Sequence, residues 1–168
     1  MDEKTLNTDL VKLFNKVGWA YKIRDAAGET AMSTDKRPFD GFAVFPEFTF
    51  FYETKLIKNK ISAFSKARVE PHQFENLLKL KALKKETAII LGLWIPRKSY
   101  RFLVFDHEFL FNLSQKSILK IQLEEYIEKG FAFDIRNFVE FKPQVLLEHR
   151  IDFLVEGLKI VGKNKNCK

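Results

Sequence analysis

A β-hairpin pattern over residues 41–52 is the feature that most constrains the fold of this chain. The residues are apolar from 41 to 45 and mostly aromatic from 48 to 52, and Pro46-Glu47 supplies a turn between the two runs. This pattern predicts two antiparallel strands joined by a tight connection.

The register of this hairpin can be counted outward from its turn. If the residues that flank the turn face each other, Asp40 lies opposite Glu53. Opposed side chains share a face with Cβ atoms roughly 4.5–5.5 Å apart, so two carboxylates placed this way repel unless a cation neutralises them. Lys55 then projects to the same face, while Thr54 points away and leaves its carbonyl near the same ion. A solvated sheet edge or a surface ion pair is the alternative interpretation.

The metal-ligand residue types narrow the kind of cation. The single cysteine, Cys167, excludes a thiolate cluster and an internal disulfide, and the histidines His72, His107 and His149 match no metal-ligand spacing. Oxygen ligands remain, which favours magnesium, with manganese as a substitute.

Composition predicts one domain that binds a polyanion. The chain has 168 residues, 46% of them hydrophobic, including 18 phenylalanines. We expect a single domain over 1–158 and a flexible basic tail over 159–168. The formal charge of +7 favours DNA or RNA as partner, with a membrane surface as the alternative. No apolar run reaches the length of a membrane span and the N-terminus is polar, so a cytoplasmic protein without membrane attachment is expected.

The remaining patterns predict a mixed β-sheet with helices packed on it, an α/β fold. The expected elements are a helix capped by Asn7 or Thr8 and ended by Gly18, a strand over 19–23, a loop over 25–37, a helix from Pro71, strands over 88–95 and 100–105, a helix capped by Ser114 and closed by Gly130, an edge strand over 131–135, and a helix over 144–157 or a strand over 151–155.

A basic stretch follows the hairpin and borders the acidic pair. Lys58, Lys60, Lys66 and Arg68 would contact a nucleic-acid backbone, and His72 would contact a phosphate. A solvated basic loop is the alternative.

Aromatic residues of the hairpin could also stack on bases. These are Phe39, Phe42, Phe50 and Tyr52, although strand spacing is more typical of a core.

Several motifs together resemble one nuclease family. Pro38-Phe39-Asp40 with Glu53-Thr54-Lys55 resembles the PD-(D/E)xK signature, and Pro71-His72-Gln73 resembles the RecU-type Holliday junction resolvases. Stretches at 23–25, 58–64 and 151–154 are also similar to that family.

The resemblance implies a restriction-endonuclease-like core, magnesium dependence, a homodimer and a four-way DNA junction as substrate. It implies that Asp40 and Glu53 bind the metal, that Lys55 orients the attacking water and that Gln73 supports the site. It also implies that Asp9 supplies a helix carboxylate to the metal.

The chain departs from this family in one respect. RecU-type resolvases carry a long stalk before the catalytic aspartate, whereas only residues 26–39 separate Asp25 from Asp40 here. A nuclease acting on flaps, nicks, duplex ends or a specific duplex sequence therefore stays open, as do a ribonuclease and a noncatalytic DNA-binding module.

Overall fold

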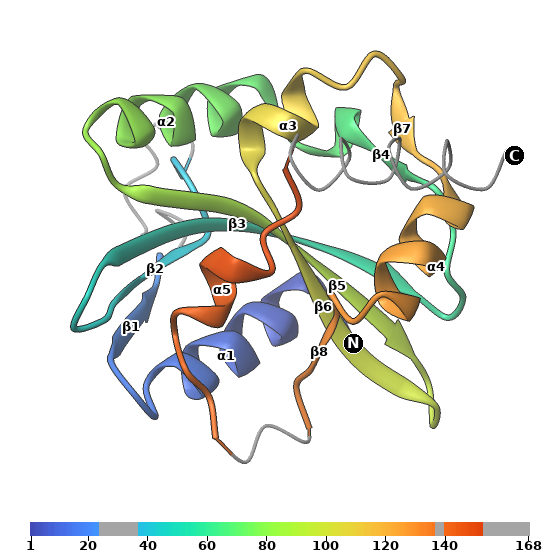
Figure 1. Cartoon of the computed structure of the whole chain (residues 1–168), viewed down its shortest axis with the longest axis horizontal. Coiled ribbons are helices and arrows are strands. Elements are labelled where there is room, and N and C mark those ends of the chain that lie inside the picture. The colour runs from blue at the N-terminus through green and yellow to red at the C-terminus, as the bar shows by residue number, and fades with distance from the viewer. Residues whose placement is uncertain (24–36, 137–139, 153–168) are drawn as a thin grey trace, which may run out of the picture.

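A computed structural model describes residues 1–23, 37–136 and 140–152. It contains a six-stranded mixed sheet with helices on both faces, which confirms the expected α/β class (Figure 1). The elements in chain order are α1 (Glu3–Phe14), β1 (Trp19–Lys22), β2 (Gly41–Val44), β3 (Thr49–Lys58), β4 (Phe64–Ser65), the 3-10 turn η1 (Lys66–Arg68), α2 (Pro71–Ala82), β5 (Glu86–Ile95), β6 (Ser99–Phe105), α3 (His107–Phe111), β7 (Ser117–Ile118), α4 (Lys120–Glu128), β8 (Phe133–Asp134) and α5 (Val145–Glu148).

The main sheet has the strand order β1-β2-β3-β5-β6-β8. Strands β3 and β5 are parallel, and the other neighbouring pairs are antiparallel. The crossover between the two parallel strands contains α2, as parallel pairing requires. The short strands β4 and β7 form a separate two-stranded sheet.

The predicted hairpin register is confirmed over β2 and β3. Gly41 pairs with Tyr52, and Val44 pairs with Thr49. The ladder stops at Gly41, and the backbone N–H of Asp40 donates to the carbonyl of Tyr52 at 3.1 Å. The predicted pairing of Asp40 with Glu53 is therefore wrong, since the Asp40 carboxylate binds Thr54 instead.

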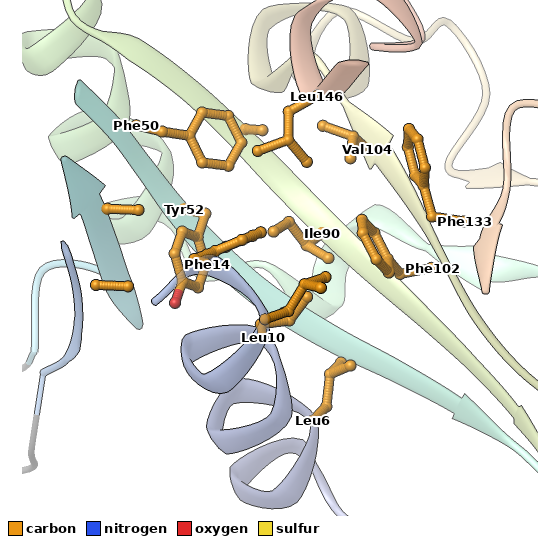
Figure 2. Close-up of a cluster of buried hydrophobic side chains, with 14 of the residues drawn as sticks. Leu6, Leu10, Phe14, Phe50, Tyr52, Ile90, Phe102, Val104, Phe133 and Leu146 are labelled. Atoms are coloured by element: carbon orange, nitrogen blue, oxygen red, sulfur yellow. The ribbon is translucent and has the colours of Figure 1, made fainter. Parts of the chain in front are cut away.

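The helices cover the two faces of the sheet and create two apolar layers. On one face α1 and α5 pack against β3, β5 and β6, and Figure 2 shows Leu6, Leu10 and Phe14 of α1 pointing toward the side chains of these strands. On the other face α2, α3 and α4 pack through residues such as Leu77, Leu110 and Leu123. Because both faces of the central strands are covered, β5 is buried from Thr87 to Leu93.

Tight packing between α1 and the hairpin explains one glycine. A Cβ atom on Gly41 would lie 2.6 Å from the hydroxyl oxygen of Tyr52, which is itself buried. That hydroxyl donates to Oδ1 of Asn7 in α1 at 3.1 Å. Gly41 therefore leaves room for the contact that connects the first helix to the hairpin.

The predicted start of the first helix is wrong. Asp2 caps α1, with its Oδ1 accepting from the N–H of Thr5 at 2.8 Å, and the helix ends at Phe14 before Gly18. Asn7 is buried inside the helix. Asn and Thr are common N-cap residues, but in this chain Asp2, which precedes Asn7 and Thr8, caps the helix.

Other element predictions are partly confirmed. Helix α2 begins at Pro71, the β5–β6 hairpin forms, and β8 is the edge strand expected within 131–135. The predicted helix from Ser114 begins only at Lys120, because Ile118 pairs with Phe64 in the small sheet. Ile151 forms a parallel bridge with Phe105 after the short α5. Residues from 153 onward, including the predicted tail, lie outside the described ranges. Residues 24–36 of the predicted loop lie outside them as well.

None of the helices in the described ranges is long and apolar enough to cross a bilayer.

Replacing Phe14 with alanine should destabilise the fold by about 3–5 kcal/mol, because it empties a site among four aromatic rings. The ring centroids of Phe45, Phe50, Tyr52 and Phe141 lie 5.5–6.4 Å from that of Phe14. Urea unfolding measures the change. The control is Ile121→Ala, at an exposed helix position where the expected change is within about 0.5 kcal/mol. Equal losses in both variants would contradict this account of the core.

Candidate active site

Strand β3 carries three buried polar residues in succession, Glu53, Thr54 and Lys55. Oε1 of Glu53 accepts from Nζ of Lys55 at 2.7 Å and from Nε2 of Gln73 at 2.5 Å. Oε2 of the same carboxylate is buried without a hydrogen-bond partner. A buried carboxylate oxygen without a partner is costly, which singles this group out from ordinary structural ion pairs.

The first turn of α2 positions Gln73. Pro71 begins the helix, and Oε1 of Gln73 accepts from the backbone N–H of Glu70 at 2.9 Å. This capping interaction leaves the amide nitrogen of Gln73 to donate to Glu53. The structure thus brings Gln73 to Glu53, the neighbour of Lys55, which is where the resemblance placed it.

Asp40 directly precedes β2, at the point where β3 continues without β2 beside it. Its Oδ2 accepts from the backbone N–H of Thr54 at 2.8 Å and also from the hydroxyl of Thr54. Its Oδ1 pairs with Nη2 of Arg37 at 2.6 Å. The Asp40 carboxylate therefore accepts from the Thr54 N–H, at a position of β3 that has no pairing partner on β2. The expectation that Thr54 simply points away from Asp40 is wrong, because its hydroxyl binds the carboxylate.

The backbone of Asp40 is fixed from two sides. Its carbonyl accepts from the N–H of Ile23 at 2.9 Å and from Nδ2 of Asn7 at 3.1 Å. Asn7 also receives the hydroxyl of Tyr52, so a single buried amide connects α1 to both strands of the hairpin.

The two carboxylates influence each other electrostatically. Burial and the negative charge of Asp40 raise the pKa of Glu53 to about 7, although Lys55 and Arg37 act in the opposite direction. The two nearby cations thus do not fully compensate the acidic pair. A further positive charge at this place would favour the ionised form of Glu53.

Asp9 is not part of the site, contrary to the role that the resemblance implied. Its carboxylate accepts from the hydroxyl of Tyr100 at 3.1 Å and pairs with Lys12 at 3.8 Å, at a different hollow of the surface. Two residues correspond to about 200° around a helix, so Asp9 points away from the side of α1 that carries Asn7.

Glu3 is the helix carboxylate that faces the site. It is four residues from Asn7 and lies on the same side of α1. Its Oε1 accepts from the backbone N–H of Leu56 at 3.2 Å and from Nη2 of Arg68 at 2.8 Å.

A cleft of about 470 Å³ opens beside Asp40. Asp40 and Thr54 line it, whereas Glu53 and Lys55 do not. Basic residues outnumber acidic ones among its lining residues, and the basic ones are Lys4, Lys22, Arg37, Lys58 and Arg68. The cleft can therefore attract an anion to the edge of the acidic pair.

The predicted phosphate-binding residues separate into two groups. Lys58 and Arg68 line the cleft, and Lys60 is exposed just beyond β3. Lys66 instead donates to the carbonyls of Phe111 and Leu113 at 3.1 and 2.8 Å, so it closes a loop.

His72 lies at the edge of the site. Its Nδ1 is 3.2 Å from a carboxylate oxygen of Glu70, and its Nε2 is 3.2 Å from the carbonyl of Arg37. Both ring nitrogens thus have protein neighbours, although the ring is only partly buried.

The donor set fits a hard divalent cation with few protein ligands. Among the described residues no group of three or more histidine, cysteine, aspartate or glutamate side chains could enclose a metal. Magnesium, however, needs only one or two carboxylates. Asp40 and the unpartnered Oε2 of Glu53 supply that chemistry, and the Thr54 carbonyl was the further ligand expected from the sequence.

Sequence reasoning missed Glu3, Asn7 and Arg37 as contributors to the site. Arg37 had a local signal, since it lies three residues before Asp40. The contacts of Glu3 and Asn7 reach β3 and the Asp40 backbone from a separate helix, and only the helix face they share could have indicated them.

Comparisons with known proteins give a limited result. No protein-family model matches the chain, and no curated protein matches it. Among solved structures it is similar to Hjc, a Holliday junction resolvase from the hyperthermophilic archaeon Archaeoglobus fulgidus. The TM-score is 0.47 and the identity 17%, over 83% of this chain and 98% of that chain. A likeness at this level concerns the path of the chain and carries no information on its chemistry.

The stability of the fold should depend on the protonation of Glu53. The folded chain raises the pKa of Glu53 from 4.5 to about 7, so it holds this proton more tightly than the unfolded chain does. The resulting stabilisation is complete below pH 4.5 and is lost as the pH rises through 7. Relative to Glu53→Gln, the unaltered chain should lose about 3 kcal/mol of unfolding free energy between about pH 4.5 and about pH 8.

Urea unfolding of both proteins across this range, without divalent cations, measures the difference. A difference that does not change with pH would refute the raised pKa.

Proposed function

We propose that this chain is a magnesium-dependent endonuclease that hydrolyses phosphodiester bonds in DNA. The observation that carries the proposal is the buried Glu53 carboxylate, which binds Lys55 and Gln73 through one oxygen and leaves the other without a partner beside Asp40. Lys55 and Arg37 do not prevent the rise in the pKa of Glu53, so a metal ion beside Asp40 and Glu53 would add the positive charge that favours the ionised carboxylates. The resemblance to PD-(D/E)xK nucleases supports the same assignment.

Asp40 and Glu53 would hold the cation, with the Thr54 carbonyl as a further ligand. When bound, magnesium supplies positive charge against the phosphate and makes hydroxide available near neutral pH. The chain contributes the fixed position of both carboxylates. Asp40 is held by Thr54 and Arg37, and Glu53 is held by Gln73.

Lys55 would donate a hydrogen bond to the attacking water and to the phosphate oxygens as negative charge develops on them. Its ammonium is already at 2.7 Å from Glu53, which fixes its direction without a large loss of freedom during the reaction. Gln73 keeps the Glu53 oxygen that faces Lys55 in place, so it acts as a positioning residue.

The basic cleft would bind the DNA backbone. Lys58 and Arg68 line it, and Lys60 extends the positive surface beyond β3. Contacts of this kind give affinity that falls with salt and read no sequence. His72, in the first turn of α2, would contact a phosphate at the rim.

Branched DNA is the proposed substrate, with a four-way junction as the first structure to test, and a homodimer would place one site on each of two of its four strands. Both statements follow from the resemblance to RecU-type resolvases. The segment that would correspond to the stalk of that family, residues 26–39, lies largely outside the described ranges.

Lys55→Ala and Asp40→Ala should each lower magnesium-dependent DNA cleavage by about 10²-fold or more. The first removes a positive charge near the reacting phosphate, and the second removes a ligand of the cation. The measurement compares cleavage of matched four-way junction, flap, single-stranded and linear duplex DNAs. Asp9→Ala is the matched control and should cleave normally, since Asp9 lies at another surface. Binding without cleavage of any substrate would leave a noncatalytic DNA-binding module instead.

Magnesium should stabilise the folded chain in the absence of DNA. Near pH 8, magnesium at 100 times its Kd should raise the unfolding free energy by about 2.7 kcal/mol. Asp40→Asn and Glu53→Gln should remove this increase, while Asp9→Asn should keep it. Thermal unfolding with and without the cation measures the effect. An increase that persists in both site variants would assign the cation to another place.

A further inference from the structure

We propose that Arg37 is an exchangeable counter-ion of the candidate active site. It pairs with Asp40 until magnesium and DNA bind, and it then moves to a phosphate of the DNA in the cleft. The inference rests on the proposed function and deepens it, because it makes the binding of magnesium and the binding of DNA cooperative.

The carboxylate oxygens of Asp40 and Glu53 are occupied to different degrees. An ionised carboxylate oxygen can accept two hydrogen bonds. Oδ2 of Asp40 already accepts two from Thr54, and Oε1 of Glu53 accepts two from side-chain nitrogens. In the described part of the chain Oε2 of Glu53 has no partner, and Oδ1 of Asp40 pairs with Arg37 at 2.6 Å. A cation shared by the two carboxylates would therefore bind these last two oxygens.

Arg37 and a divalent cation would compete for Oδ1 of Asp40. The guanidinium is in direct contact with this oxygen, so a cation bound to the same oxygen would meet a like charge there. Solvent screens this repulsion little, because the Asp40 side chain is only 5% exposed. Magnesium binding is therefore favoured when Arg37 leaves the carboxylate.

Asp40 does not depend on Arg37 for its position. Thr54 binds Oδ2 through its backbone N–H and its hydroxyl. Asn7 and Ile23 both donate to the carbonyl of Asp40. The side chain of Arg37, by contrast, is 25% exposed and lines the cleft. Its departure would leave the carboxylate in place and make Oδ1 available to the cation.

DNA in the cleft offers Arg37 another anionic partner. The planar guanidinium can donate two parallel hydrogen bonds to the oxygens of one phosphate. Lys58 and Arg68 line the same cleft, so they would hold the DNA backbone within reach of Arg37. A phosphate that takes Arg37 from Asp40 would strengthen magnesium binding. By linkage, magnesium would strengthen DNA binding by the same factor.

A permanent ion pair is the competing interpretation of the contact between Arg37 and Asp40. Arg37 would then remain on the carboxylate and help to order it while magnesium binds. Removing Arg37 would in that case weaken magnesium binding or leave it unchanged, whereas exchange predicts tighter binding. The direction of the change therefore distinguishes the two interpretations.

Calorimetric titration with magnesium chloride, near pH 8 and without DNA, measures this direction. We expect Arg37→Ala and Arg37→Met to bind magnesium about tenfold more tightly than the unaltered chain. The methionine variant keeps the length of the side chain without its charge.

Lys58→Ala is the matched control for this titration. It removes one positive charge from the same cleft, at a residue that makes no ion pair with Asp40 in the described structure. Its magnesium Kd should stay within about twofold of that of the unaltered chain. Unchanged or weaker magnesium binding in both Arg37 variants, or an equal gain in Lys58→Ala, would overturn the proposal.

The exchange also predicts how magnesium changes the affinity for DNA. Anisotropy of a labelled linear duplex gives its Kd with and without magnesium, in a Lys55→Ala background where cleavage is slow. Adding Arg37→Ala should lower the factor by which magnesium tightens DNA binding about fivefold or more, whereas adding Lys58→Ala should leave this factor unchanged. The same factor with and without Arg37 would mean that its side chain does not move to the phosphate and would overturn the proposal.

DNA cleavage by the unaltered chain, measured in parallel, separates this inference from the proposed function. Cleavage together with an unchanged magnesium Kd in the Arg37 variants sinks only this inference. Tighter magnesium binding in those variants, without cleavage of any substrate by the unaltered chain, supports the exchange and sinks only the proposed function.

Discussion

The structure depends on the burial of β3 on both of its faces. This strand pairs with β2 on one side and with β5 on the other, and the helices of both layers pack over it. Apolar side chains on the two faces of β3 contribute to both cores, which is why neither layer is independent of the hairpin. The same burial makes the polar residues at its middle expensive, so their presence there calls for a function.

The candidate site exists because three separate elements converge on that strand. The hairpin brings Asp40 to Thr54, the first turn of α2 brings Gln73 to Glu53, and α1 fixes the backbone of Asp40 through Asn7. Each of these contacts is itself buried and hydrogen-bonded, so the carboxylates have little freedom to separate. Burial and the charge of Asp40 disfavour the ionised form of Glu53, and a bound cation would favour it.

The placement of the site at a sheet edge also explains the surfaces around it. Strand β3 extends beyond β2 at Asp40, and the cleft forms in the space that a longer β2 would have filled. The basic residues reach this cleft from α1, β1, β3, η1 and, for Arg37, the segment before β2.

Local sequence patterns were sufficient to predict the hairpin, its register between Gly41 and Thr49, and the start of α2. These depend on local patterns, since a strand alternates with period two and a proline at the start of a helix is a local signal. The period of the strand placed Glu53 and Lys55 on one face, whereas Gln73 was assigned to the site only by the resemblance to a nuclease family. Tertiary packing sets which side of α1 faces the hairpin. As a result Glu3 rather than Asp9 faces the site, and Asn7 is a buried connection rather than a helix cap. The rotation of a helix against a sheet depends on how all its apolar side chains pack together, which no short segment of sequence specifies.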